Sequence, residues 1–144
     1  MRTKIFLIFV LFAISLFGQV SMIDENTLCI EVAEENNKNL HCIIILIETG
    51  TWAIYFRELN EPIHLIETDN FKYYFKSIEI DKDDNGFWAS TTASLVNDSQ
   101  KKLFKDIINS KHIIVSTENK SYSFNFNKYK RELENNAFYK KTMQ

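Results

Sequence analysis

Glycine and proline are scarce in this sequence, which has three glycines and one proline among 144 residues. Because a site that cradles phosphate with backbone amides needs a glycine-rich loop, the scarcity of glycine argues against a nucleotide site of that kind. It also argues, together with the single proline, against a flexible linker or a low-complexity tail. The chain is therefore expected to be mostly folded rather than mostly linker.

Recognisable catalytic and metal-binding patterns are missing as well. No segment resembles the serine-nucleophile pattern GxSxG, the zinc pattern HExxH or a phosphate-binding loop. The three histidines, His41, His64 and His112, are scattered, and none has a second histidine or cysteine at convincing metal-ligand spacing. The sequence therefore favours binding over catalysis.

The first 18 residues have the pattern of a secretory signal. Arg2 and Lys4 give a positive start, residues 5–14 are unbroken apolar, and Gly18 is a small residue that suits a cleavage site. The apolar run is shorter than the roughly 20 residues that span a bilayer as a helix. We therefore expect residues 1–18 to be a signal peptide, the remainder to be periplasmic or extracellular, and no membrane span to remain after cleavage. A short uncleaved anchor is the alternative.

The negative net charge argues against a nucleic-acid partner. Loss of Arg2 and Lys4 with the leader would change the formal net charge from −2 to about −4. Binding to nucleic acid needs a net basic surface, so we expect no nucleic-acid partner.

Aromatic and β-branched residues favour strands in the rest of the chain, which includes 12 phenylalanines and six tyrosines. Short apolar or alternating segments between polar turns predict about seven or eight strands. These segments include residues 28–34, 42–47, 52–57, 71–80, 87–93, 113–117 and 122–126. Within 71–80 the apolar phase slips by one residue, which a β-bulge or a switch between sheets would explain.

Two later segments have helical spacing. Any of Asn97, Asp98 and Ser99 can cap a helix, and Gln100 follows Asn97 at the spacing of a capping box. An apolar stripe follows, which predicts a helix near 98–110. Asn127 suits the cap of a final helix near 128–139, with a loose tail at 140–144. Helices segregated from a run of antiparallel strands indicate a mainly β (α+β) fold. We expect an antiparallel β-sandwich or a strongly bent sheet, in a single domain spanning residues 24–139.

The order of elements from Leu95 to Leu133 is a helix, the strand Ile113–Thr117, a polar turn, the run Tyr122-Ser123-Phe124-Asn125-Phe126 and a closing helix. This order resembles the second half of small exported β-sandwich proteins of the invasion-associated locus B type, and of accessory proteins of type VI secretion. The resemblance implies an extracytoplasmic binding or assembly role, and it implies no catalytic residues.

The two cysteines suggest a disulfide, because an even number in an oxidising compartment usually pairs. If the chain around them forms a hairpin with its turn centred on Glu35-Asn36, Cys29 lies opposite Cys42. A turn centred one residue later places the two on a diagonal, where a bridge is harder to close. Two buried free thiols are the alternative.

An acidic turn gives the only cofactor suggestion. Asp81, Asp83, Asn85 and Gly86 match positions 1, 3, 5 and 6 of a calcium-binding loop, but position 12 is Thr92 instead of the usual glutamate. A weak calcium site is therefore one interpretation. The other is a solvated hairpin turn in which Asn85 and Gly86 supply the positive φ.

Aromatic residues suggest a second candidate site. Trp52, Tyr55, Tyr74 and Trp88 would form a face for contact with a sugar or a peptide if their side chains lie on one surface. Residues of this type are also common in sheet cores.

The leading functional prediction is an exported, non-enzymatic binding or accessory protein that contacts a protein partner through a sheet face or an exposed edge. Immunity and secretion-associated roles are forms of it, and a subunit of a larger envelope assembly is a related one. The alternative is a small extracytoplasmic hydrolase or carbohydrate-acting domain that uses the acids of Asp81–Asp84.

Overall fold

The computed structural model describes residues 19–76, 81–84 and 86–144, and for residues 81, 83 and 87–94 it describes the backbone only. The expected signal peptide, residues 1–18, lies outside the described residues. In the described part, ten strands form two antiparallel sheets, and short helices complete the fold. The predicted mainly β, α+β architecture is confirmed.

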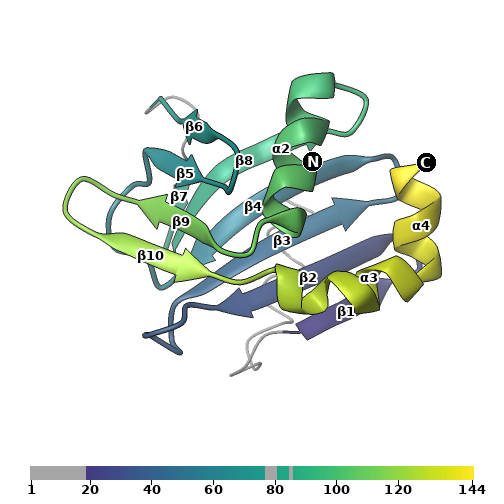
Figure 1. Cartoon of the computed structure of the whole chain (residues 1–144), viewed down its shortest axis with the longest axis horizontal. Coiled ribbons are helices and arrows are strands. Elements are labelled where there is room, and N and C mark those ends of the chain that lie inside the picture. The colour runs from purple at the N-terminus through teal and green to yellow at the C-terminus, as the bar shows by residue number, and fades with distance from the viewer. Residues whose placement is uncertain (1–18, 77–80, 85) are drawn as a thin grey trace.

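The larger sheet has the strand order β1-β2-β3-β4-β8-β7, and the smaller has the order β10-β9-β5-β6 (Figure 1). The larger sheet consists of β1 (Gln19–Asp24), β2 (Thr27–Ala33), β3 (His41–Ile47), β4 (Thr51–Arg57), β7 (Asp81–Asp83) and β8 (Gly86–Ser94). The smaller sheet consists of β5 (Leu65–Glu67), β6 (Lys72–Tyr74), β9 (Ile113–Ser116) and β10 (Ser121–Phe124). The helices are α2 (Asp98–Asn109), α3 (Lys130–Asn135) and α4 (Ala137–Met143), with a 3-10 turn η2 (Asn127–Tyr129) before α3.

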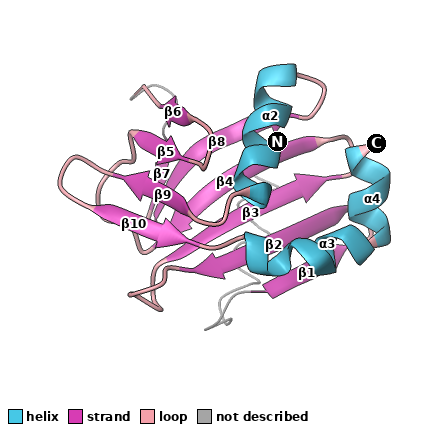
Figure 2. Cartoon of the chain, viewed as in Figure 1, coloured by secondary structure: helices cyan, strands magenta, loops and turns pink. Residues whose placement is uncertain are grey.

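The helices and the smaller sheet lie on one face of the larger sheet (Figure 2). The main hydrophobic core fills the space between the larger sheet and this layer. Every buried hydrophobic side chain of the helices and of the smaller sheet belongs to this core. Trp52 of β4 meets Phe104 of α2 edge-on, with ring centroids 5.4 Å apart. Phe56 of β4 meets Phe124 of β10 at 5.9 Å. The aromatic side chains of β4 therefore hold both the helical layer and the smaller sheet.

The opposite face of the larger sheet carries a second apolar cluster. Its buried members come from the three central strands β2, β3 and β4: Cys29, Ile43, Ile45, Ala53 and Tyr55. Ile23 of β1 and Ile47 pack against it. Strand β3 contributes side chains to both clusters, which is why its residues after His41 are an unbroken apolar run.

The strand predicted over residues 71–80 is shorter in the structure, where β6 ends at Tyr74. β6 belongs to the smaller sheet, and β7, which starts at Asp81, belongs to the larger one. Residues 77–80 lie outside the described residues, so the phase slip within the predicted strand stays a prediction.

The first predicted helix is confirmed, with Asn97 as its cap. The Asn97 side chain accepts a hydrogen bond from the backbone N–H of Gln100 at 3.1 Å. The stripe predicted for its buried side is also observed, since Leu103, Phe104, Ile107 and Ile108 are its buried residues.

The C-terminal end differs from the expected single helix and loose tail. Asn136 has extended backbone angles, which end α3, and its side chain accepts the N–H of Tyr139 at 2.9 Å to start α4. Residues 140–143 are therefore the second half of a helix rather than a loose tail. Asn127 does not cap; Asn125 accepts the N–H of Lys128 instead, at 3.2 Å.

The folded domain also starts earlier than the expected residue 24. Gln19–Asp24 forms strand β1, which pairs with β2 along an edge of the larger sheet. This strand was not predicted, because it directly follows the apolar leader and has only a short alternating pattern of its own.

Candidate functional site

Strand β1 is the candidate binding element, because it forms a long edge of the larger sheet. It pairs with β2 on one side, with Ser21 opposite Cys29 and Met22 opposite Leu28. No strand pairs with its other side in the described part of the chain. Its sequence contains no lysine, arginine or proline, and its one charge, Asp24, lies at its end. Edges of this kind are open to pairing with another strand.

The side chains of β1 alternate between the two faces of the sheet. Val20 packs against the main core, and Met22, on the same face, is 40% exposed. Ser21 and Ile23 are on the opposite face, where Ile23 packs against the second apolar cluster. The Oγ atom of Ser21 is buried and has no hydrogen-bond partner. A buried hydroxyl without a partner is unfavourable by about 1–3 kcal/mol, so Ser21 is the position on β1 that most needs a further contact.

The three other sheet edges are short, charged or covered. β7 has three residues, two of them aspartates and one a lysine, and β6 has three residues including Lys72. β10 is covered by the loop after β2, where Glu34 Oε1 accepts the N–H of Ser123 and the N–H of Glu35 donates to the Ser123 carbonyl, both at 3.1 Å. Natural sheets use these devices against unwanted pairing. In the described part of the chain, β1 is neither short nor covered and has no charge before Asp24, although its pairing with β2 shifts register between Met22 and Asp24.

The predicted aromatic face is wrong, because the structure does not bring its residues to one surface. Trp52 is 1% exposed in the main core, whereas Tyr55 is 2% exposed in the second cluster on the other face of the sheet. Tyr74 is 70% exposed, but it lies on β6 of the smaller sheet. The backbone of Trp88 pairs with Tyr55, and its side chain is outside the described part. Trp52 and Tyr55 are three residues apart in one strand, so they must point to opposite faces.

The stretch predicted as an acidic turn includes strand β7 (Asp81–Asp83) and, at Gly86, the first residue of β8, and the calcium interpretation stays a prediction. Asn85 and the side chains of Asp81 and Asp83 lie outside the described residues. Within the described residues, no group of three or more potential metal ligands is present. The hydrolase alternative rests on the same acids and stays a prediction too.

Gly86 has a different role from the one expected of it. It is the first residue of β8, without a positive φ, and it pairs with Arg57. A Cβ atom at this position would overlap the carbonyl oxygen of Phe56. Gly86 is therefore needed for the close approach of β4 and β8 rather than for a left-handed turn.

The predicted disulfide is wrong, since Cys29 and Cys42 are both free and buried. Cys29 pairs with Ile45, three residues along β3 from Cys42, and Cys42 pairs with Val32. The hairpin loop is longer than expected, running from Glu34 to Leu40, whose backbone groups close it at 2.8 Å. This shift of register places the thiols on opposite faces of the sheet, where no bridge can form.

Burial makes both thiols poor nucleophiles. It raises the pKa of Cys29 to about 12, with a smaller contribution from the nearby carboxylate of Glu31. Burial also raises the pKa of Cys42 well above its usual value. Reactive cysteines have the opposite environment, exposed and electropositive, so these two are structural.

A buried charged cluster lies beside the second apolar cluster and was not predicted. His41 Nδ1 is 2.7 Å from Glu31 Oε1, and His41 Nε2 is 2.8 Å from the carbonyl oxygen of Lys38. Arg57 donates to the same Glu31 oxygen, and its Nη2 lies 3.1 Å from His41 Nδ1. The Glu31 and His41 side chains are 1% and 4% exposed.

The contacts of this cluster indicate a structural role. Both ring nitrogens of His41 have partners, and the Glu31 carboxylate contacts both Arg57 and His41 in a closed environment, so neither Glu31 nor His41 is available to a substrate. The cluster joins β2, β3 and β4, because His41 pairs with Ala33 on one side and with Arg57 on the other. The signal in the sequence was a single glutamate within an otherwise apolar strand.

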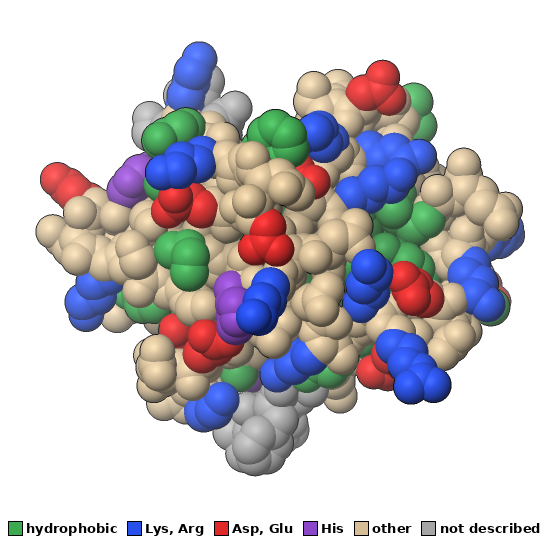
Figure 3. Space-filling model, viewed as in Figure 1, with side chains coloured by type: hydrophobic (Ala, Val, Ile, Leu, Met, Phe, Trp, Pro, Cys, Tyr) green, Lys and Arg blue, Asp and Glu red, His purple; other side chains and the backbone are tan. Residues whose placement is uncertain are grey.

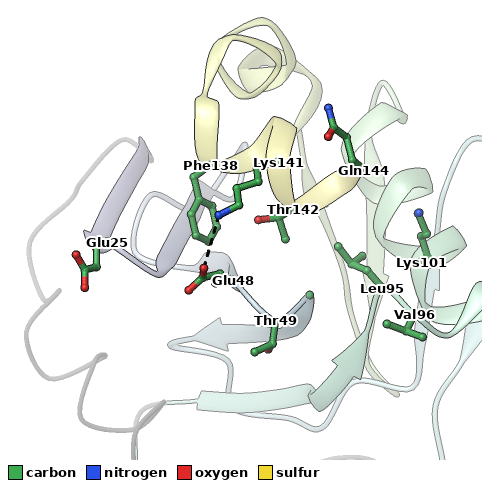
Figure 4. A pocket seen from close by; sticks show the side chains of 11 residues that line it. Glu25, Glu48, Thr49, Leu95, Val96, Lys101, Phe138, Lys141, Thr142 and Gln144 are labelled. Atoms are coloured by element: carbon green, nitrogen blue, oxygen red, sulfur yellow. Dashed lines mark ion pairs between the residues drawn. The ribbon is translucent and has the colours of Figure 1, made fainter.

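A small groove lies at the end of the larger sheet, beneath α4 (Figure 4). Its volume is about 280 Å³, which is below the usual range of ligand pockets. Glu48 and Lys141 face each other across it at 3.7 Å, and both are substantially exposed. Such a loose pair, open to solvent, does not position a ligand or a reacting group.

Charged side chains of both signs are interspersed over the helix-bearing face of the molecule (Figure 3). None of the described helices is long and apolar enough to span a lipid bilayer. Comparison of the chain with protein-family models, with curated proteins and with solved structures gives no match. The resemblance to exported β-sandwich proteins therefore stays a prediction.

Proposed function

We propose that this chain is an exported binding protein that recognises a protein partner by pairing an extended partner segment with the outer edge of β1. The observation that carries the proposal is the contrast between β1 and the three other sheet edges. β1 has six residues and no charge before Asp24, whereas the others are short, charged or covered. Export is supported by the pattern of the first 18 residues.

The mode of recognition follows from the chemistry of an edge strand. The backbone N–H and C=O groups along its outer side supply affinity for any extended segment. The side chains then supply selectivity, since a partner strand would meet Val20 and Met22 on one face and Ser21 and Ile23 on the other. An apolar partner strand with a small polar residue at its centre fits this pattern best.

Site-specific photo-crosslinking in cells that export the chain tests the proposal. A photoreactive amino acid replaces Met22, which is 40% exposed on β1, and in a matched control it replaces Tyr74, which is 70% exposed on β6. We expect a protein adduct at position 22 and none at position 74. Absence of an adduct at position 22 over a range of salt concentrations would contradict the proposal.

Fractionation of the same cells tests export separately. We expect the chain outside the cytoplasm, with an N-terminus close to Gln19. A chain that stays in the cytoplasm with Met1 intact would contradict export while leaving the edge contact open to test.

A further inference from the structure

We propose that the partner strand is β1 of a second copy of this chain, paired antiparallel about a two-fold axis at Ser21. This inference rests on the proposed function, since it uses the same edge. The two larger sheets would join into one continuous sheet of twelve strands. Isologous contacts of this kind are the commonest way in which identical chains associate.

The register follows from the alternation of side chains. A two-fold axis perpendicular to the sheet keeps both helical layers on the same side, so residues of the same face must lie opposite each other. Centred on Ser21, it pairs Val20 with Met22 and Gln19 with Ile23. No two like charges are opposed, and the apolar pair lies on the core face, where cross-strand apolar pairs are favourable.

Registers shifted toward Asp24 are poorer. An axis at Met22 places Asp24 opposite Val20 and leaves the Ser21 hydroxyl facing Ile23. An axis at Ile23 pairs Met22 with Asp24. Each of these sets a carboxylate against an apolar side chain, and the axis at Met22 gives the hydroxyl of Ser21 no partner.

The buried Ser21 hydroxyl is an independent observation that favours the axis at Ser21 over the axis at Met22. Its Oγ has no hydrogen-bond partner in the described part of the chain. At a two-fold axis, the same hydroxyl of the second copy lies directly across the strand pair, and paired serines form cross-strand hydrogen bonds. A foreign partner would need a serine or threonine at one defined position, whereas a second copy always supplies one.

The exposure of Met22 also supports a second copy of this chain as the partner. It is one of four large hydrophobic side chains that are exposed in the described part, the others being Phe71, Tyr74 and Val96. In the proposed register, each Met22 covers Val20 of the other copy. Val20 already packs against the main core, so the contact would extend that core across the axis.

Cysteine cross-linking tests the register. Because Ser21 is paired with Cys29 of the same chain, the experiment uses a Cys29→Ala background, in which Ser21→Cys can bond only to another molecule. Cys42 is retained, since it is fully buried on the opposite face of the sheet. We expect mild oxidation to convert the Ser21→Cys variant to a covalent dimer of twice the chain mass.

Ile23→Cys in the same background is the matched control. It lies on the same face of β1, but in the proposed register its counterpart is offset by four residues, or about 13 Å, which is too far for a disulfide. We expect it to form no covalent dimer, so it should run at the mass of one chain on a denaturing gel without reductant. A covalent dimer from Ile23→Cys and none from Ser21→Cys would overturn the proposed register.

Light scattering after size exclusion measures the association without cross-links. Met22→Lys changes two symmetric contacts at once, so we expect it to raise the dimer dissociation constant about tenfold. Tyr74→Lys, an equivalent change on β6, should leave it unchanged. A wild-type chain that stays monomeric at every concentration overturns the second copy as partner.

The outcomes separate this inference from the proposed function. A photo-adduct at position 22 whose partner has a different mass, with no Ser21→Cys dimer, would retain edge recognition and exclude the second copy. Absence of both an adduct and a dimer would contradict both proposals.

Discussion

Replacing Glu31 with glutamine removes one negative charge from a buried site that it shares with Arg57 and His41. Glu31 is 1% exposed, and it accepts from Arg57 and contacts His41 at 2.7 Å. Breaking a buried ion pair by removing one partner costs about 3–5 kcal/mol, because the remaining charge is left in a poorly solvated place. Arg57 is 18% exposed and can turn partly toward solvent, so we expect a loss near the lower limit, about 3 kcal/mol.

The assay is urea denaturation followed by the fluorescence of Trp52, which is buried against Phe104 and becomes solvated on unfolding. For a domain of this size, with a denaturant slope of about 2 kcal/mol/M, the expected loss lowers the midpoint by about 1.5 M. The slope itself should not change, because the substitution removes no surface from the core.

Two further variants test whether the loss of stability in Glu31→Gln results from the removed charge. The triple variant Glu31→Leu, His41→Val, Arg57→Met replaces all three polar side chains by apolar ones, and it should recover the stability to within about 1 kcal/mol of the wild type. Glu67→Gln removes a carboxylate that lies 2.8 Å from Lys72 at the surface, and it should leave the midpoint unchanged. A Glu31→Gln midpoint equal to that of Glu67→Gln would refute the reasoning.

Three other predictions concern the backbone, the thiols and the first helix. Gly86→Ala should lower the free energy of unfolding by about 2–3 kcal/mol in the same urea assay, because its Cβ overlaps the Phe56 carbonyl; a neutral result would show that β4 and β8 can separate there. Cys29 should resist alkylation at pH 8, since a pKa of about 12 leaves a thiolate fraction on the order of 10⁻⁴, and mass spectrometry after iodoacetamide treatment should find it labelled only in urea. Asn97→Ala should cost about 1 kcal/mol through loss of the cap of α2, measured by thermal unfolding, and an unchanged transition would contradict a role for the cap.

Local patterns in the sequence were sufficient to predict those structural features that depend on a single short segment of the chain. The cap and stripe of α2 lie within twelve residues of each other, and helix geometry relates them directly. The apolar run of β3 also follows from burial, because both faces of this strand are covered. These features gave the fold class and the position of the main helix.

Features that depend on register could not be predicted in the same way. The cysteines were expected to pair because the hairpin loop was taken as shorter than its actual span, Glu34–Leu40. The Glu31, His41 and Arg57 cluster needs the pairing of three strands to become visible. The edge position of β1 depends on the order of strands in the sheet, which a single sequence does not contain.

The contact between the β2–β3 loop and β10 limits where this protein tolerates inserted residues. Hairpin loops ordinarily accept extra residues, because their tips touch little else. Here Glu34 and Glu35, the first residues after β2, bind both backbone groups of Ser123, so the start of this loop connects the larger sheet to strand β10 of the smaller sheet. An insertion directly after β2 would break these hydrogen bonds between the two sheets. A tag inserted there should therefore disturb strand β10, almost ninety positions further along the sequence.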